Sequence, residues 1–223
     1  MPAKPVFHRK PLMALSRSPL PLGAIRPEGW LFAQLELQAV ALRDALINRW
    51  PDLADSEVWH GPRESEWRLD IALLAAVLPL GYLLDDPVWI GASVRRLEWA
   101  LEAQREDGCL PPAESENDDD AWCARAALMQ ILQQWYVATA DKRILAHMLR
   151  YCKYERQRLK ERALGQKSSA MAGELLQPTL WLYRITERGF LLELARDLQA
   201  NSVDWTAFFH TMPLKSPVEK QHP

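Results

Sequence analysis

Three short segments of this chain share one layout, and this repeat constrains the fold more than any other feature. They read GYLLDDP at 81–87, WYVATAD at 135–141 and LYRITER at 182–188. In each segment an apolar helical pattern ends at an aromatic residue, a polar turn follows, and a second amphipathic pattern begins. The three tyrosines lie about fifty residues apart, which is a period typical of stacked helical repeats. The repeat therefore predicts an all-α protein built from helical hairpins.

The hydrophobic periodicity between these turns predicts seven helices and no strand. We expect helices over about residues 26–50, 67–84, 87–105, 120–139, 142–162, 174–185 and 189–200. Asp120 and Asp141 stand where the fourth and fifth of these helices need N-caps. The charged tract at 153–162 is expected to be a solvated surface. Hairpins that curve as they stack form an open solenoid or a closed toroid, and seven helices are too few to close a twelve-helix ring.

Proline sets the expected domain boundaries. Residues 1–24 hold five of the sixteen prolines and show no helical period, so they predict an extended, proline-rich arm. Residues 25–212 are expected to form one helical domain, and residues 213–223, which contain three more prolines, an irregular tail.

Charge and hydropathy exclude several classes of partner. The formal net charge is −2 and 25% of the residues are charged, which gives no basic surface for nucleic acid. The longest apolar run, residues 71–84, is interrupted by Pro79 and is shorter than the roughly twenty residues of a membrane span. No continuous apolar core follows the basic residues near the N-terminus, as a secretory signal requires. We therefore expect a cytoplasmic protein with no membrane and no nucleic-acid partner.

Cysteine and tryptophan usage bears on the chemistry. Cys109, Cys123 and Cys152 are an odd number without C-x-x-C spacing, so they predict reduced thiols and no metal site. The ten tryptophans indicate either wide helix–helix cores or sugar stacking, and composition does not separate these two uses.

A family resemblance appears in the segment PLGAIRPEGWL at 21–31, followed by QLELQ at 34–38. These residues resemble the opening of the β-L-arabinofuranosidase family of glycoside hydrolases, a glycoside hydrolase family 127-like pattern. Further matches are PLGYLLDDP at 79–87, MLRY at 148–151, WLY at 181–183, FLLELA at 190–195 and DWT at 204–206. The resemblance covers roughly residues 20–215 and only the N-terminal half of the family.

This resemblance implies about half of an (α/α)6 toroid, in a family that hydrolyses terminal arabinofuranosides. It further implies a cysteine nucleophile near a zinc ion held by other cysteines and a glutamate, all in the second half of the family. No cysteine of this chain matches that cluster. We therefore expect no cofactor in this chain, leave its catalytic residues unknown, and expect a truncated domain that is inactive alone.

The first candidate sugar contacts are Trp59, Glu64, Glu66 and Trp67, in a loop where the family carries a longer aromatic and acidic motif. Aromatic faces and carboxylates are the mixture that sugar pockets use for stacking and hydroxyl recognition. The alternative is structural, with the two tryptophans as core anchors and the two glutamates as solvated or capping groups.

The second candidate group is Asp120, Trp122 and Arg125, which keeps an acid, one tryptophan and the arginine of the family's D-W-W-P-R motif. These residues are expected either to line a substrate pocket or to serve as a helix cap with a paired arginine.

Two classes of function remain open. The first is a glycoside hydrolase-like domain that recognises an L-arabinofuranoside-type carbohydrate. The second is a non-catalytic helical scaffold, or a lectin-like protein, whose open edge binds a partner, the missing C-terminal half or a second copy of itself.

Overall fold

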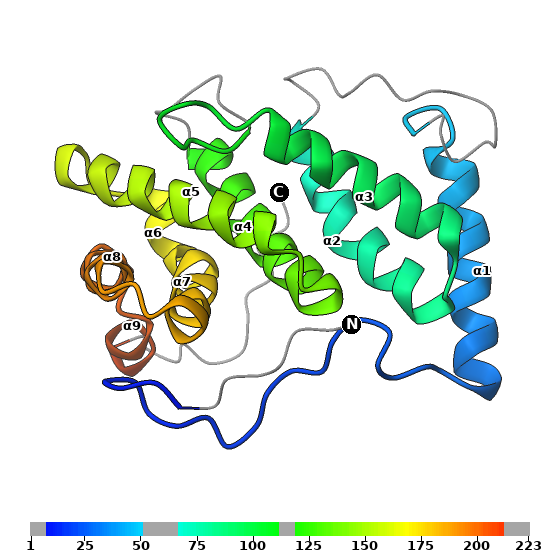
Figure 1. Cartoon of the computed structure of the whole chain (residues 1–223), viewed down its shortest axis with the longest axis horizontal. Helices are drawn as coiled ribbons and strands as arrows, with labels where there is room; N and C mark the ends of the chain where they lie inside the picture. The colour runs from blue at the N-terminus through cyan, green and yellow to red at the C-terminus, as the bar shows by residue number, and fades with distance from the viewer. Residues whose placement is uncertain (1–7, 51–66, 112–118, 212–223) are drawn as a thin grey trace.

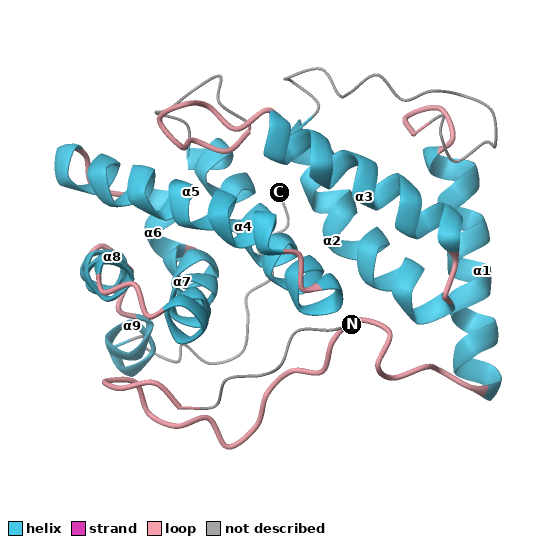
Figure 2. Ribbon diagram, in the orientation of Figure 1, coloured by secondary structure: helices cyan, strands magenta, loops and turns pink. Residues whose placement is uncertain are grey.

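A computed structural model describes residues 8–50, 67–111 and 119–211 of the chain. These ranges contain nine helices and no strand (Figures 1 and 2). The helices are α1 (Gly29–Leu46), α2 (Trp67–Leu84), α3 (Pro87–Glu102), α4 (Asp119–Thr139), α5 (Lys142–Glu161), α6 (Gln166–Ala170), α7 (Ala172–Thr186), α8 (Phe190–Ala200) and α9 (Trp205–Thr211). The predicted all-α fold is confirmed for this part of the chain.

The helices pair as three hairpins, α2–α3, α4–α5 and α7–α8 (Figure 1). The first helices of the hairpins contact one another in the order α2, α4, α7, and the second helices α5 and α8 are also in contact. Helix α1 packs on α2 at the edge of the molecule. The helix pairs therefore pack in two layers, as in a helical bundle.

The three repeated turns are closed by the same backbone device. Asp85, Ala140 and Glu187 each adopt a left-handed conformation, with φ of 55°, 58° and 55°. The amide of Ala140 donates to the Tyr136 carbonyl at 2.7 Å, and the amide of Glu187 donates to the Tyr183 carbonyl at 2.8 Å. A left-handed residue after the last helical turn is a common helix C-cap. The repeat in the sequence is therefore a repeated helix stop.

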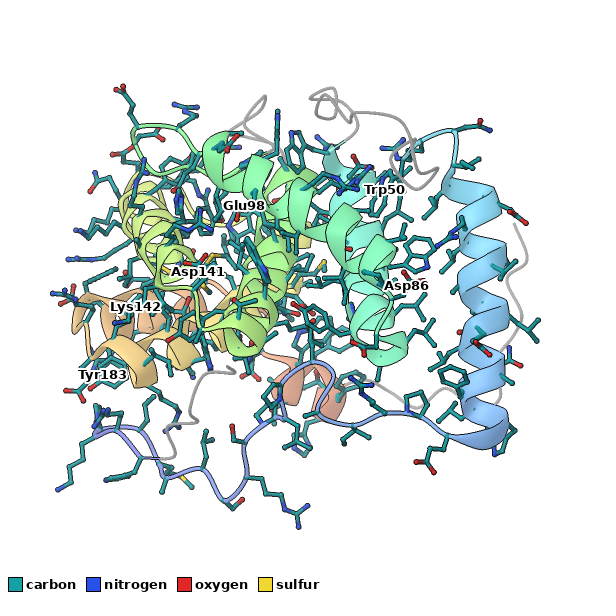
Figure 3. The ribbon with its side chains drawn as sticks, turned by 45° about the vertical axis from the view of Figure 1, so that its right-hand side comes forward. Trp50, Asp86, Glu98, Asp141, Lys142 and Tyr183 are labelled. Atoms are coloured by element: carbon teal, nitrogen blue, oxygen red, sulfur yellow. The ribbon has the colours of Figure 1, made fainter. Side chains whose placement is uncertain are left out.

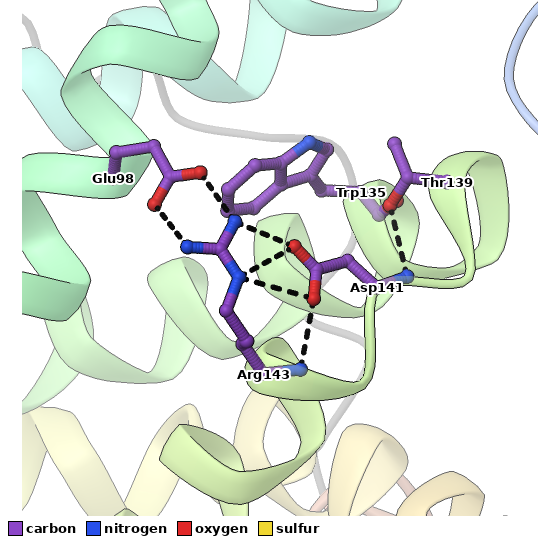
Figure 4. Close-up of polar contacts among 5 residues, drawn as sticks. All are labelled: Glu98, Trp135, Thr139, Asp141 and Arg143. Atoms are coloured by element: carbon purple, nitrogen blue, oxygen red, sulfur yellow. Dashed lines mark hydrogen bonds and ion pairs between the residues drawn. The ribbon is translucent and has the colours of Figure 1, made fainter.

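Ion pairs join the second hairpin to the first (Figure 4). Asp141 caps α5 as predicted, since its carboxylate accepts the Arg143 amide at 2.9 Å. The Arg143 guanidinium bridges this carboxylate, at 2.7 Å, to Glu98 of α3, at 2.8 Å. The turn of the second hairpin is thereby held against α3, the second helix of the first hairpin.

Several helix boundaries differ from the predicted ones. Helix α1 begins at Gly29, after Glu28 in an extended conformation, and ends at Leu46, so it is shorter at both ends than expected. Helix α4 begins at Asp119, which places Asp120 inside the first turn and not at the cap. The expectation of a solvated tract at 153–162 was wrong in part, because Glu155 and Leu159 turn inward and are buried.

Helix α2 is the first helix of the first hairpin, and its bounds are the predicted ones. By length and composition it is the one helix of the described ranges that could cross a membrane. Its contacts with α1, α3 and α4 bury a large share of its residues. Packing against these neighbours accounts for its apolar composition.

Candidate functional site

The first group of predicted sugar contacts lies mostly outside the described ranges. Trp59, Glu64 and Glu66 belong to residues 51–66, which the structure does not describe. Trp67 opens α2, is fully buried, and packs its ring 4.5 Å from the ring of Trp99. Among the described residues its indole nitrogen finds no hydrogen-bond partner. Its placement is that of a core anchor.

Asp120 lies at the surface, where the starts of three helices meet. It forms ion pairs with Lys167 of α6 and, at 3.6 Å, with Arg68 of α2. The hydrogen bond and charge of Lys167 hold the pKa of Asp120 below its usual value. The neighbouring Asp119 accepts the Lys167 amide at 2.9 Å and the Ser168 hydroxyl at 2.6 Å. These carboxylates tie α4 to α2 and α6.

Trp122 and Arg125 lie inside the protein, between α4 and α5. The Trp122 indole donates to the Glu155 carboxylate at 2.7 Å, and Arg158 donates to the same carboxylate at 2.9 and 2.7 Å. Arg125 is fully buried and interacts with Tyr151. Burial and the charge of Glu155 hold the pKa of Tyr151 well above its usual value. This network is internal, and sequence reasoning missed Glu155 because it belongs to a charged tract.

The arm crosses the end of the hairpins where the repeated turns lie (Figures 1 and 3). At its start, Arg9 pairs with Glu187 at 2.6 Å, and the Tyr183 hydroxyl donates to the Lys10 carbonyl. Just after the arm, Arg26 pairs with Asp85 at 2.9 Å. The arm therefore spans from the turn of the third hairpin to the turn of the first.

The repeated tyrosines all face this arm. Gly23 approaches Tyr82 so closely that an added Cβ atom would lie 3.3 Å from the Tyr82 carbonyl oxygen. Tyr136 lines a pocket beneath the arm, and Tyr183 bonds to it. Tyr82 and Tyr183 thus contact the arm directly, and Tyr136 lies in the wall of the pocket that the arm covers.

The pocket beneath the arm has a volume of about 680 Å³. Arm residues 15–21 form one wall, and residues 173–185 of α7 with Tyr136 and Gln133 of α4 form the other. The wall of the pocket is mainly aliphatic and aromatic, with two glutamines and two arginines among its polar groups. Pockets of this size and composition are typical of small-molecule sites.

Three side chains give the pocket its chemistry. The rings of Tyr136 and Trp181 meet edge to face with centroids 5.5 Å apart. Gln133 is 9% exposed, and its Oε1 atom has no hydrogen-bond partner among the residues that the structure describes. Burial raises the pKa of Tyr136, so its hydroxyl stays protonated at neutral pH. The pocket thus offers an aromatic surface, and the Gln133 oxygen is buried beneath its wall.

The cysteines show no sign of activation. All three are buried and free. Burial raises the pKa of Cys109 and Cys123, and raises that of Cys152 to about 12. Within the described ranges no three His, Cys, Asp or Glu side chains gather as metal ligands would. The described thiols are therefore protonated at neutral pH and are poor nucleophiles.

Comparisons of the chain with protein-family models, with curated proteins and with solved structures found no match. What the protein does must therefore be argued from its own residues.

Proposed function

We propose that this chain is a glycoside hydrolase-like domain that binds an L-arabinofuranoside-type sugar in the pocket beneath the arm and does not cleave it. The observation that carries this proposal is the Tyr136–Trp181 ring pair in the wall of a pocket of about 680 Å³. The apolar face of a sugar ring suits an aromatic side chain. The glutamines and arginines of the same wall can form hydrogen bonds with sugar hydroxyls.

The chemistry of the pocket favours binding over hydrolysis. Glycoside hydrolysis commonly needs two carboxyl groups on either side of the scissile bond. The described residues that line this pocket include no aspartate and no glutamate, and also no cysteine, the nucleophile that the resemblance implies. Its cations, Arg17 and Arg184, can donate hydrogen bonds to ring or hydroxyl oxygens but cannot protonate a leaving group at neutral pH.

The two-layer packing of the hairpins fits the proposed descent from an (α/α)6 toroid. In this proposal α2, α4 and α7 are inner helices, α3, α5 and α8 are outer helices, and the arm closes the rim. The proposed domain is then about half of the ring, and the sugar occupies the inner layer at the end where the repeated turns lie.

Calorimetric titration with methyl L-arabinofuranosides tests the proposal. We expect binding at millimolar sugar by the wild-type chain and its loss in Trp181→Ala, which removes the aromatic face of the pocket. Trp205→Ala is the matched control, because Trp205 lies on α9 and does not line the pocket. No release of p-nitrophenol from an aryl L-arabinofuranoside is expected from any of these proteins.

Gln177→Leu separates a binding role from a structural one. Gln177 lines the pocket and is exposed, so leucine should leave the free energy of unfolding nearly unchanged. The same change should weaken sugar binding by about threefold to tenfold, the value of one hydrogen bond. The proposal is overturned if the folded wild-type chain produces no heat with these sugars, or if Trp205→Ala weakens binding as much as Trp181→Ala.

A further inference from the structure

Helix α1 is apolar on two opposite faces, and only one of them is covered. Leu35, Ala39, Leu42 and Leu46 recur at intervals of four, three and four and pack toward the rest of the protein. At 3.6 residues per turn these four side chains form one narrow stripe. This inner stripe explains how α1 packs on α2.

The opposite face of α1 carries a second stripe, formed by Trp30, Ala33, Leu37, Val40 and Ile47, which we call the outer stripe. Its large members are exposed to 81% at Trp30, 67% at Leu37, 61% at Val40 and 37% at Ile47. Helix α1 stands at the edge of the molecule, so no other described helix covers this face (Figures 1 and 3). Exposed apolar side chains at heptad spacing are typical of a helix–helix interface.

The outer stripe is symmetric about its own midpoint. Asp44 occupies the one polar position, and with it the intervals are three, four, three, four and three. The pattern therefore reads the same from both ends. An antiparallel copy of α1 would place Trp30 opposite Ile47, Leu37 opposite Val40 and Ala33 opposite Asp44. We infer that the outer stripe of α1 is a self-association surface, on which α1 of a second copy of this chain packs antiparallel.

The charged side chains beside the outer stripe favour pairing with a second copy of α1. Glu36 and Arg43 lie on the same flank of the outer stripe, two turns apart. In an antiparallel pair that flank meets the same flank of the second copy, so each Glu36 lies near Arg43 of the other chain. Arg43 already sits 3.7 Å from Asp86 and over the Trp89 ring at 5.9 Å, which fixes its position before the copies meet.

The surface around the outer stripe can also accommodate α1 of a second copy. A pocket of about 350 Å³ borders it between α1 and the α2–α3 turn, where side chains of a second copy can enter. Asp44 faces only Ala33 in this register, which leaves room for its carboxylate to reach water. A single polar residue in an apolar seam specifies register. Glu36 beside the outer stripe and Asp44 within it disfavour a lipid surface, since helices that lie on membranes carry mainly Lys and Arg.

Sedimentation equilibrium of the full chain tests the inference, which does not depend on sugar binding. We expect a dimer for the wild type. Leu37→Glu places two carboxylates in the seam and should raise the dissociation constant by about a hundredfold or more, as loss of a central anchor does. Gln38→Glu adds the same charge one position away, off the stripe, and should leave the dimer intact.

Cysteine cross-linking tests the direction of the pairing, since the three native cysteines are buried. In the antiparallel register, a disulfide should form when Ala33→Cys and Asp44→Cys proteins are mixed and not when Ala33→Cys is oxidised alone. A dimer in which Ala33→Cys alone cross-links overturns the antiparallel arrangement. A folded wild-type monomer at high concentration, a dimer that survives Leu37→Glu, or a monomer that binds phosphatidylcholine–phosphatidylserine vesicles through Leu37 overturns the inference as a whole.

Discussion

Glu155 is the residue on which the polar core between α4 and α5 depends. Its carboxylate is fully buried and accepts hydrogen bonds from Trp122 and Arg158. Removing it by Glu155→Ala leaves the Trp122 indole without this acceptor and Arg158, which is largely buried, without its counter-ion. We expect a loss of about 3 kcal/mol in the free energy of unfolding, measured by urea denaturation.

Glu161→Ala provides the control for this substitution. Glu161 lies on the same helix but is exposed, and it accepts a hydrogen bond from the exposed Gln157. Its loss should change stability by less than about 0.5 kcal/mol. Equal effects of the two substitutions would show that Glu155 contributes no more than a surface carboxylate.

Sequence reasoning selected Trp122 and Arg125 as residues of a substrate pocket or of a helix cap with a paired arginine, but it did not find the buried Glu155 that accepts the Trp122 hydrogen bond. Glu155 lies 33 residues after Trp122 in the chain and in the midst of charged residues, so local composition indicates solvent. Helical spacing does place Glu155 on the inner face with Cys152 and Leu159. The helical periodicity of this face indicates the burial of Glu155 better than the charge of the surrounding tract does.

At the scale of helices and turns, the sequence predicts where the hairpins turn but not the backbone conformation of the turns. The repeat located all three turns, and the predicted bounds of α2 match the structure. It did not reveal the left-handed residues, because glycine is the usual sign of that conformation and these turns use Asp85, Ala140 and Glu187. Helices α6 and α9 were also missed, since five and seven residues are too few to establish a period.

The turn of the second hairpin can be tested with glycine. Ala140 adopts φ of 58°, which costs a residue with a Cβ atom about 1 kcal/mol relative to glycine. Ala140→Gly should therefore stabilise the chain by up to about 1 kcal/mol in thermal or urea unfolding. Ala138→Gly, inside α4, is the opposed control and should destabilise it by about 0.5–1 kcal/mol. If Ala140→Gly also destabilises the chain, the entropy that glycine adds to the unfolded state outweighs the strain that it relieves at this turn.

At the scale of the whole molecule, the arm connects the hairpins to one another and closes the pocket. It bonds to the turns of the first and third hairpins and forms a wall over the second. The proline content predicted its lack of helix but not its path, because the contacts that fix it span up to 175 residues of sequence. The site beneath the arm could not be predicted for the same reason, since its two walls are far apart in the chain.

Gly23 tests whether the arm is held by its fit to the first hairpin. It adopts φ of 76°, and an added Cβ would meet the Tyr82 carbonyl at 3.3 Å, so Gly23→Ala strains the arm where it docks. With about 1 kcal/mol of strain, the detached arm should become about fivefold more populated, and trypsin should cleave after Arg17 correspondingly faster. Gly189→Ala is the control, because its Cβ meets nothing within 4 Å and its φ is −54°. Equal cleavage rates of the two variants would show that the fit of Gly23 against Tyr82 does not hold the arm in place.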